Sequence, residues 1–132
     1  KTFLVTIMFA FPALFAAFLF ACANTKYLGA IPDQEYGYVD VRPGAHMFYW
    51  FYGSTNPDLP RNDLPIVLWL QGGPGAGGSG YGNFGEMGPL NTTLQPREYT
   101  WLNKVNLLFI DNPVGAGYSY VDEPSLLTTN VS

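Results

Sequence analysis

The stretch from Pro65 to Gly80 reads Pro-Ile-Val-Leu-Trp-Leu-Gln-Gly-Gly-Pro-Gly-Ala-Gly-Gly-Ser-Gly. Its first half, Ile66 to Leu70, is continuously apolar and rich in β-branched and aromatic residues. That composition predicts a β-strand buried on both faces, as in a parallel sheet. At Gln71 the apolar run ends and a run of glycines begins. The stretch therefore predicts a buried strand that leads directly into a glycine loop.

The glycines predict a site for a developing negative charge. Gly72 and Gly73 have no Cβ, so their N–H groups can approach a ligand closely. Pro74 favours extended backbone at Gly73, which we expect to hold that N–H in one direction. Fixed N–H donors are what an oxyanion hole requires. The alternatives are a flexible linker, which would not begin at a Trp-bearing strand, and a phosphate loop, for which a Lys-Ser/Thr pair is missing.

Two further regions predict the rest of a mixed sheet, and hence an α/β fold. Residues 36–42 alternate as a half-buried strand does, Arg42 to Ala45 is a turn signal, and His46 to Tyr52 is an aromatic strand. We expect these to form an antiparallel hairpin at the sheet edge. Val105 to Ile110 predicts a second buried strand, and residues 81–96 show no helical period.

The N-terminal segment predicts a secretory signal peptide. Lys1 is followed by an apolar run to Phe20 and then by Ala21-Cys22-Ala23, a small-x-small cleavage site. A membrane anchor is the alternative, but Pro12 and the small residues favour cleavage. We therefore divide the chain into residues 1–23 and 24–132, and expect no stable membrane span after cleavage. Cleavage also removes the only cysteine, so the mature part can form no internal disulfide.

Composition narrows the class of partner. The 132 residues carry 6 Lys and Arg against 10 Asp and Glu, a net charge of −4 with no basic patch, which excludes a typical nucleic-acid binder. No stretch after Asn24 has the period of an amphipathic helix, although strands apolar on both faces need helices to cover them. The chain also begins at Lys1 rather than Met. We therefore expect an incomplete part of a longer protein.

Three motifs in order resemble the serine carboxypeptidases: Trp69 to Gly75 (WLQGGPG), Glu86 to Pro89 (EMGP) and Asp111 to Tyr120 (DNPVGAGYSY). Gln before the glycines is similar to the retinoid-inducible group of that family. The resemblance implies the N-terminal part of an α/β-hydrolase fold. It also implies a secretory-pathway enzyme, secreted or lysosomal, that releases C-terminal residues from peptides or proteins by acyl transfer through a serine beyond this chain. It implies no cofactor and no metal.

The resemblance assigns roles to five residues. Gly73 would supply one oxyanion N–H, next to Gly72 in the substrate site, and Trp69 would line the cleft. Gln71 and Glu86 would bind the terminal carboxylate of the peptide. The residues alone leave alternatives: Trp69 in the core, Gln71 as a strand-end amide that satisfies the loop backbone, and Glu86 as an exposed loop acid.

Several residues are unsuited to the triad. His46 precedes the oxyanion strand, whereas in this fold the triad follows it in the order Ser, Asp, His. Ser79 and Ser119 lack the last glycine of G-x-S-x-G, and we expect no helix after either. Asp111, before Asn112-Pro113, is expected to cap a turn. The catalytic triad is therefore expected outside the chain.

Ala76 stands where the family has a cysteine, and Gly77 and Gly78 replace its serines, so the family's disulfide and serine contacts are not expected here. Asn91-Thr92-Thr93 and Asn130-Val131-Ser132 are glycosylation sequons. Two other functions stay open: an acyltransferase of the same family type, and a non-catalytic secreted binding protein on the same scaffold. A downstream G-E-S-Y-type elbow followed by Asp and His would favour the enzyme.

Overall fold

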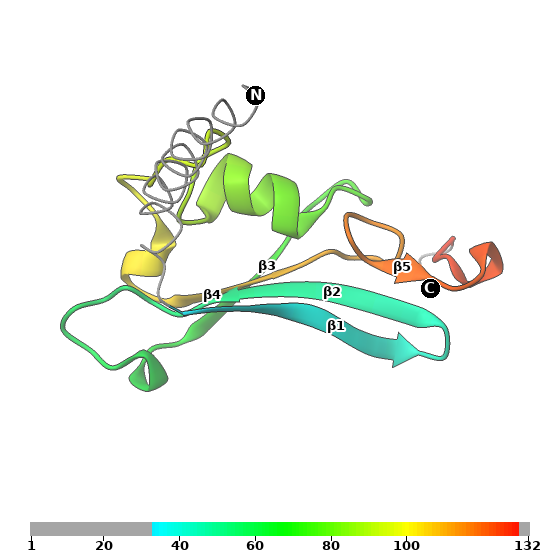
Figure 1. The fold of residues 1–132 in the computed structure, drawn as a ribbon, viewed down its shortest axis with the longest axis horizontal. Helices are drawn as coiled ribbons and strands as arrows, with labels where there is room; N and C mark the ends of the chain where they lie inside the picture. The colour runs from blue at the N-terminus through cyan, green and yellow to red at the C-terminus, as the bar shows by residue number, and fades with distance from the viewer. Residues whose placement is uncertain (1–32, 130–132) are drawn as a thin grey trace, which may run out of the picture. The chain divides into compact units, whose positions relative to one another are not determined.

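The computed structural model describes residues 33–129, so the predicted signal peptide and the Asn130 sequon lie outside the described residues. The chain forms a mixed sheet with one substantial helix packed on it (Figure 1). The strands are β1 Gln34–Arg42, β2 Ala45–Tyr52, β3 Ile66–Leu70, β4 Asn106–Ile110 and β5 Tyr120–Val121. The helices are η2 Arg61–Asp63, η3 Gly78–Met87, η4 Trp101–Asn103 and η5 Pro124–Leu126.

The predicted hairpin is confirmed. β1 and β2 pair antiparallel around the turn at Pro43-Gly44, where Gly44 takes φ +70°, a conformation that glycine adopts without steric penalty. The prediction that the first strand is half-buried is wrong, because β1 is exposed along almost its whole length and only Gly37 is half-buried. β1 lies at the edge of the sheet and no described segment packs over it as η3 does over the centre.

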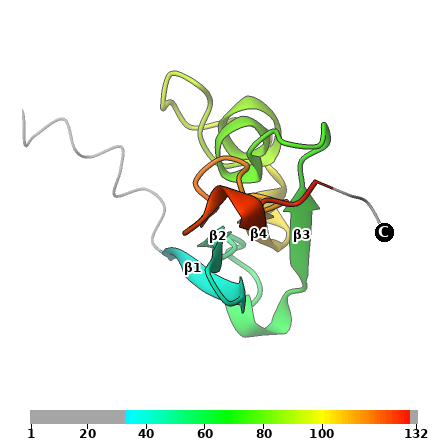
Figure 2. The ribbon, with the colours of Figure 1, turned by 90° about the vertical axis from the view of Figure 1, so that its right-hand side faces the viewer.

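Both strands predicted from the apolar runs form, and they are parallel to each other. β3 pairs with β4 from Ile66↔Asn106 to Leu70↔Ile110, and β4 pairs antiparallel with β2. The strand order is β1-β2-β4-β3, which Figure 2 shows nearly end-on, and the short β5 pairs antiparallel with the first residues of β2. Because parallel neighbours end at the same edge, the residues that follow β3 and β4 emerge together.

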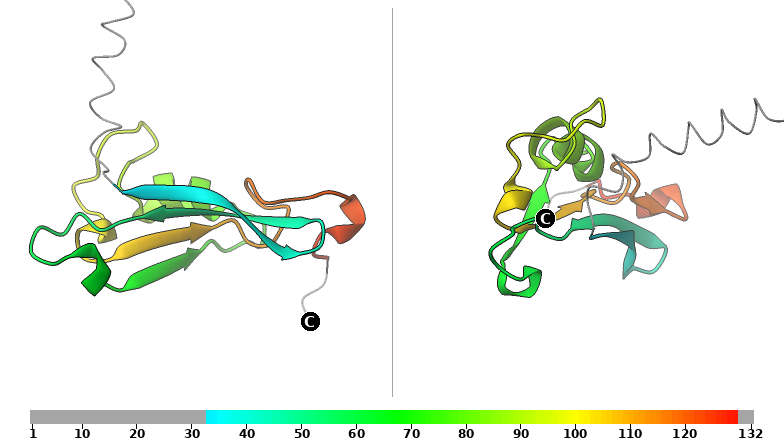
Figure 3. Two further views of the ribbon diagram at one scale, coloured as in Figure 1. Left: turned by 60° about the horizontal axis from the view of Figure 1, so that its bottom comes forward. Right: turned by 60° about the vertical axis from the view of Figure 1, so that its left-hand side comes forward.

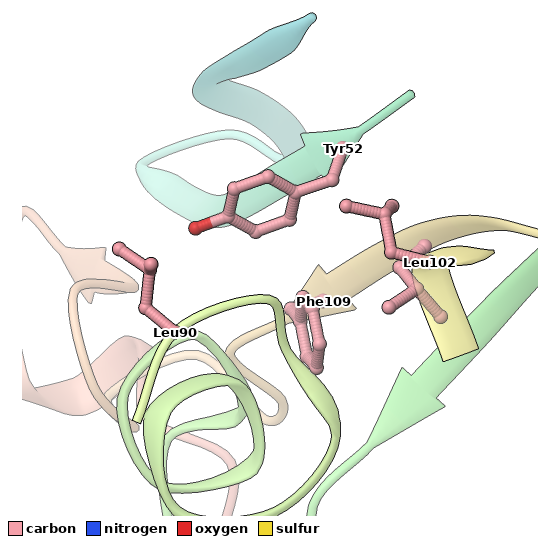
Figure 4. Close-up of a cluster of buried hydrophobic side chains, with 5 residues drawn as sticks. Tyr52, Leu90, Leu102 and Phe109 are labelled. Atoms are coloured by element: carbon pink, nitrogen blue, oxygen red, sulfur yellow. The ribbon is translucent and has the colours of Figure 1, made fainter. Parts of the chain in front are cut away.

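The core lies between the sheet and η3. Its buried side chains come from β2, β4, η4 and the segment after η3: Tyr52, Leu90, Leu102, Leu107 and Phe109 (Figure 4). Burying each such apolar side chain contributes about 1.5–3 kcal/mol relative to leaving it exposed. The core therefore fixes β4 and η3 against each other.

The sequence predicts no helix in this region, and that prediction is wrong, because η3 spans Gly78–Met87. Four of its ten residues are glycine, each of which disfavours a helix by about 1 kcal/mol relative to alanine. Packing outweighs this, since Phe84 and Met87 contact the core. The turns are wide: the Gly88 N–H donates to the Asn83 carbonyl, five residues back, at 2.8 Å. At Gly78 a Cβ would lie 2.5 Å from the Ile110 carbonyl oxygen, so glycine permits the close approach of η3 to β4.

The face of the sheet opposite η3 is open among the described residues (Figure 3, left). On β3, Ile66, Leu68 and Leu70 are 61%, 48% and 52% exposed. The prediction that this strand is buried on both faces is therefore wrong for residues 33–129, because η3 covers only the face that carries Val67 and Trp69. In that same part of the chain, no helix has the length and apolar character needed to span a membrane.

Candidate functional site

The glycine loop, residues 71–77, joins β3 to η3 and presents two unshielded donors. Gly72 and Gly73 are exposed, and within residues 33–129 no acceptor takes either N–H. Gly73 has φ +144°, so the expectation that Pro74 holds it in ordinary extended geometry is wrong. A Cβ at Gly73 would lie 3.1 Å from the Gly75 nitrogen and 3.3 Å from the Ala76 nitrogen, because the loop folds back on itself. Only glycine suits this position.

Gln71 is oriented by the tryptophan two residues before it. The Trp69 Nε1–H donates to the Gln71 Oε1 at 2.9 Å. Because an indole N–H can only donate, this contact identifies the oxygen of the amide. Among the described residues the Gln71 Nε2 has no acceptor, so its two N–H donors are available to a ligand. The alternative in which the Gln71 side chain satisfies the loop backbone does not match this hydrogen bond.

The helix η3 packs against the Trp69–Gln71 pair through Gly82. A Cβ at Gly82 would lie 2.5 Å from the Trp69 Nε1 and 2.9 Å from the Gln71 Oε1. Trp69 also contacts the core and lies edge-on to Trp101, with ring centroids 6.1 Å apart, which agrees with the alternative that places it in the core. Gly82 was not identified from the sequence, where an isolated glycine carries no such signal.

Glu86 follows Gly82 by four residues in η3, which puts both on the same side of the helix. Its side chain is exposed and makes no ion pair with a described residue. No Lys or Arg occurs from Trp69 to Pro96. The donors near the loop are therefore amides and backbone N–H groups, with one carboxylate on the neighbouring helix.

Asp111, directly after β4, is fully buried and does more than cap a turn. Its Oδ1 accepts from the Ser79 N–H at 2.8 Å, and its Oδ2 accepts from the Ser79 hydroxyl at 2.6 Å and the Tyr118 N–H at 2.8 Å. The Asp111 carbonyl accepts from the Ser119 hydroxyl at 2.6 Å. We call Asp111, Ser79, Tyr118 and Ser119 the Asp111 cluster.

The two serines of this cluster are buried, with 1% and 3% exposure for Ser79 and Ser119, and both hydroxyls donate within the cluster. The expectation that neither is a nucleophile is consistent with this geometry. One premise is wrong, because Ser79 lies inside the helix η3. The role of Asp111 was missed because its partners lie far away in the sequence and only the fold brings them together.

His46 joins the hairpin to the segment after β5. Its Nδ1 lies 2.6 Å from an Asp40 carboxylate oxygen and its Nε2 lies 3.2 Å from an Asp122 oxygen. The ring stacks on Tyr120 at 4.5 Å between centroids. The hydrogen bond to Asp40 raises the pKa of His46, burial opposes the rise, and Asp122 adds to it. These contacts are those of a structural histidine.

The Asn91 sequon lies in a hydrogen-bonded surface turn. The Asn91 Oδ1 accepts from the Thr93 N–H at 2.9 Å, the Thr93 hydroxyl at 2.8 Å and the Gln95 N–H at 3.0 Å. These bonds use only the oxygen of the side-chain amide. The nitrogen, to which a glycan would be attached, is engaged by no described acceptor.

Comparison with known proteins supports the resemblance. The profile of the family described as Serine carboxypeptidase matches residues 29–132. Serine carboxypeptidase-like 51 of Arabidopsis thaliana is 55% identical over 108 residues, covering 77% of this chain and 23% of the relative. Retinoid-inducible serine carboxypeptidase of Mus musculus is 58% identical over 89 residues, covering 67% of the chain and 20% of the relative. Venom serine carboxypeptidase of Apis mellifera is 46% identical, with 70% and 20% covered.

The chain thus spans between a fifth and a quarter of the length of these relatives. The match covers β3, the glycine loop, η3 and the Asp111 cluster, all of which fall within residues 29–132. The chain belongs to the serine carboxypeptidase family.

Proposed function

We propose that this chain is the N-terminal part of a serine carboxypeptidase with an α/β-hydrolase fold, which releases the last residue of peptides. One observation carries the proposal: Gly72 and Gly73, whose N–H groups have no acceptor within residues 33–129, directly follow Gln71. The Gln71 amide nitrogen has no acceptor in that same range, and Trp69 fixes its oxygen. This arrangement offers donors to an oxyanion and to a terminal carboxylate within one short loop.

The reaction would proceed by acyl transfer. A serine oxygen supplied by the longer protein attacks the last peptide carbonyl carbon, and a histidine takes the serine proton. The carbonyl oxygen becomes an oxyanion, which accepts a hydrogen bond from the Gly73 N–H. The carbon–nitrogen bond then breaks and the C-terminal residue leaves with the proton from histidine. Water then attacks the acyl carbon while the histidine takes a proton from it, and the serine oxygen leaves with that proton, which releases the shortened peptide.

The binding contribution of this chain would come from Gln71 and Glu86. The Gln71 Nε2 donates to one oxygen of the terminal carboxylate, whereas Glu86 shares a proton with it. One oxyanion donor contributes about 2.7–4 kcal/mol to transition-state stabilisation. We further propose that the protein is made in the secretory pathway, secreted or lysosomal, with a glycan at Asn91, which suits its exposed turn.

The test uses the full-length protein and two peptides that differ only at the end: a free C-terminal carboxylate or a C-terminal amide. A carboxypeptidase releases the last residue from the first peptide much faster than from the second. Binding of the first peptide without turnover would instead identify a non-catalytic binding protein. Transfer of the acyl group to an added alcohol, with little hydrolysis, would identify an acyltransferase. Gln71→Leu should raise KM for the carboxylate peptide and leave kcat nearly unchanged, since the amide acts in binding.

A further inference from the structure

We propose that Asp111 is a positioning residue for the glycine loop: its buried carboxylate fixes the loop from behind and so sets the direction of the Gly73 N–H. The inference rests on the proposed function, because it assigns Asp111 a part in building the oxyanion site. Asp111 would not touch the substrate. It would act through Ser79, the second residue of η3.

Both ends of the glycine loop are held by the adjacent residues Ile110 and Asp111. At the start of the loop, Leu70 is in register with Ile110 in the parallel β3–β4 pair. At its end, Gly78 approaches the Ile110 carbonyl so closely that a Cβ would lie 2.5 Å from that oxygen, and Ser79 bonds to Asp111. The loop therefore closes on Ile110–Asp111 at either end. Moving the Asp111 contacts would release one of the two anchors.

The carboxylate replaces a missing helix cap. The N-terminal residues of a helix have N–H groups without intrahelical partners, and a negative charge there is favourable. At the N-cap of η3 stands Gly77, which has no side chain to accept these donors. The Asp111 Oδ1 accepts the Ser79 N–H instead, and Oδ2 accepts the Ser79 hydroxyl. Asp111 thus determines where η3 begins and the glycine loop ends.

A second loop, residues 112–119, holds the same carboxylate from its other side. The Tyr118 N–H donates to the Asp111 Oδ2 at 2.8 Å. Gly117 has φ +53°, and a Cβ there would collide with the carboxylate. A Cβ at Gly77 would lie 3.0 Å from the Gly117 Cα, so the two loops touch where each has a glycine. With three donors and no exposed surface, the carboxylate has one position in which all its partners are satisfied.

An oxyanion site depends on donors that are already in place when charge develops, so a small displacement has a large effect on rate. A misplacement of about 1 Å can reduce catalysis by ~10²-fold. The displacement would act on the transition state far more than on bound substrate, because the oxyanion is absent from the ground state. The expected signature is therefore a loss of kcat with little change in KM.

The test compares three variants of the full-length enzyme. Asp111→Asn keeps the size of the side chain but turns one acceptor oxygen into a donor, which then opposes the Ser79 or the Tyr118 N–H. Ser79→Ala removes the hydroxyl donor and keeps the Ser79 N–H contact. Ser119→Ala is the control: its hydroxyl is similarly buried and donates to the Asp111 backbone carbonyl, not to the carboxylate. That hydroxyl also accepts the Phe48 N–H at 2.8 Å, so its removal costs stability without touching the carboxylate.

We expect kcat to fall by about 10²-fold in Asp111→Asn and by about tenfold in Ser79→Ala, with KM within about threefold of wild type. Ser119→Ala should keep kcat within about twofold, even if its melting temperature falls as far as that of Ser79→Ala. Hydrogen exchange should be faster in the first two variants, and unchanged in the control, at the amide of residue 79, which donates to Asp111, and at the Tyr81 amide, which donates to the Gly77 carbonyl.

Equal kcat losses in the two serine variants, or an unchanged kcat in Ser79→Ala, would overturn the role of Asp111 while the proposed function stands. If Asp111→Asn does not fold, the two serine variants decide the question. A wild-type enzyme that releases no C-terminal residue would overturn the proposed function and this inference together.

Discussion

Among single residues, Gly73 combines a backbone conformation that favours glycine with close backbone neighbours. Its φ of +144° disfavours any residue with a Cβ, and a Cβ would contact the Gly75 and Ala76 nitrogens at 3.1 and 3.3 Å. We predict that Gly73→Ala in the full-length enzyme lowers kcat by about tenfold and changes KM much less, because the loop must shift by a few tenths of an ångström. Steady-state kinetics on a carboxylate peptide measures this.

The control for Gly73→Ala is Gly80→Ala, where a Cβ would meet no atom within 4 Å. This variant should keep wild-type kinetics. An active-site titration that shows equal numbers of folded sites makes the comparison secure. A folded Gly73→Ala enzyme with undiminished kcat would exclude this residue from the oxyanion site.

The His46 link predicts a pH-dependent stability. Asp40, and to a smaller extent Asp122, raise the pKa of His46 in the folded protein. A raised folded pKa means that the folded state binds the proton more tightly than the unfolded state. The stabilisation is therefore full below the unfolded value of 6.5 and is lost as the pH rises through the folded pKa.

The Tm of the full-length protein should fall from acidic to alkaline pH, and it should fall by more than the Tm of His46→Gln does. The partner carboxylates are 76% and 61% exposed, so the change should be small and weaker in high salt. Asp40→Asn should flatten the profile more than Asp122→Asn. Identical profiles for wild type and His46→Gln would show that the link contributes no pH dependence.

Glu86 predicts a pH dependence of a different kind, in substrate binding. No Lys or Arg occurs from Trp69 to Pro96, so this region offers no cation to a terminal carboxylate. An ionised Glu86 beside that carboxylate is repelled, and the two bind well only when they share one proton. We predict that KM rises from acidic to neutral pH, and rises less in Glu86→Gln. Parallel KM profiles for the two enzymes would remove Glu86 from the carboxylate site.

At the scale of elements, the contact between η3 and β3 is the most sensitive. Gly82 lies against the Trp69–Gln71 pair, so Gly82→Ala should push the Gln71 amide out of place. We expect a rise in KM for peptides with a free carboxylate and a lower stability. Gly80→Ala in the same helix should be neutral or stabilise by up to about 1 kcal/mol. The measurement pairs KM with denaturant unfolding, and equal KM values for the two variants would contradict the prediction.

The elements also show how far the sequence alone could lead. The hairpin was predictable because its strands alternate locally and its turn carries Pro43-Gly44, and β3 and β4 because they are short apolar runs bounded by breakers. The helix η3 was not, because its glycines hide any local preference and its stability comes from distant partners. The two-residue strand β5 is too short to leave a pattern.

For the candidate site, motifs that resemble those of the family point to Trp69, Gln71, Gly72, Gly73 and Glu86, and their roles stay predictions. It did not reveal that Trp69 orients Gln71, nor that Gly82 packs on both. Asp111 was recognised only as a strand-end residue. The four hydrogen bonds that its oxygen atoms accept join Asp111 to η3 and to the loop 112–119, and nonlocal contacts of this kind leave no periodic signal.

At the scale of the whole molecule, the described part has one covered face and one open face. Apolar side chains of β3 and β4 line the open face, among them Ile66, Leu68 and Leu70. We predict that residues 24–132 produced alone show no sharp thermal transition, tend to aggregate and release no C-terminal residue from peptides. Light scattering and thermal unfolding of that segment provide the test.

A substitution on the open face tests whether exposed apolar side chains cause the aggregation of the isolated segment. Leu68→Lys should make the isolated segment more soluble, because it breaks up the open apolar face. In the full-length protein the same change should impair folding if the remaining polypeptide covers this face. A cooperative transition in the wild-type segment alone, with dispersed amide resonances, would contradict the prediction.

The position of β4 between β2 and β3 has a consequence for biosynthesis. The hairpin closes over a two-residue turn and can form as soon as Tyr52 leaves the ribosome, whereas β3 has no described partner until β4 follows it. Throughout the translation of the glycine loop, η3 and η4, the nascent chain therefore carries β3 as an unpaired hydrophobic strand. That interval is when a chaperone would be needed, and synonymous codons that slow translation between Gln71 and Val105 should lengthen it and lower the yield of folded protein.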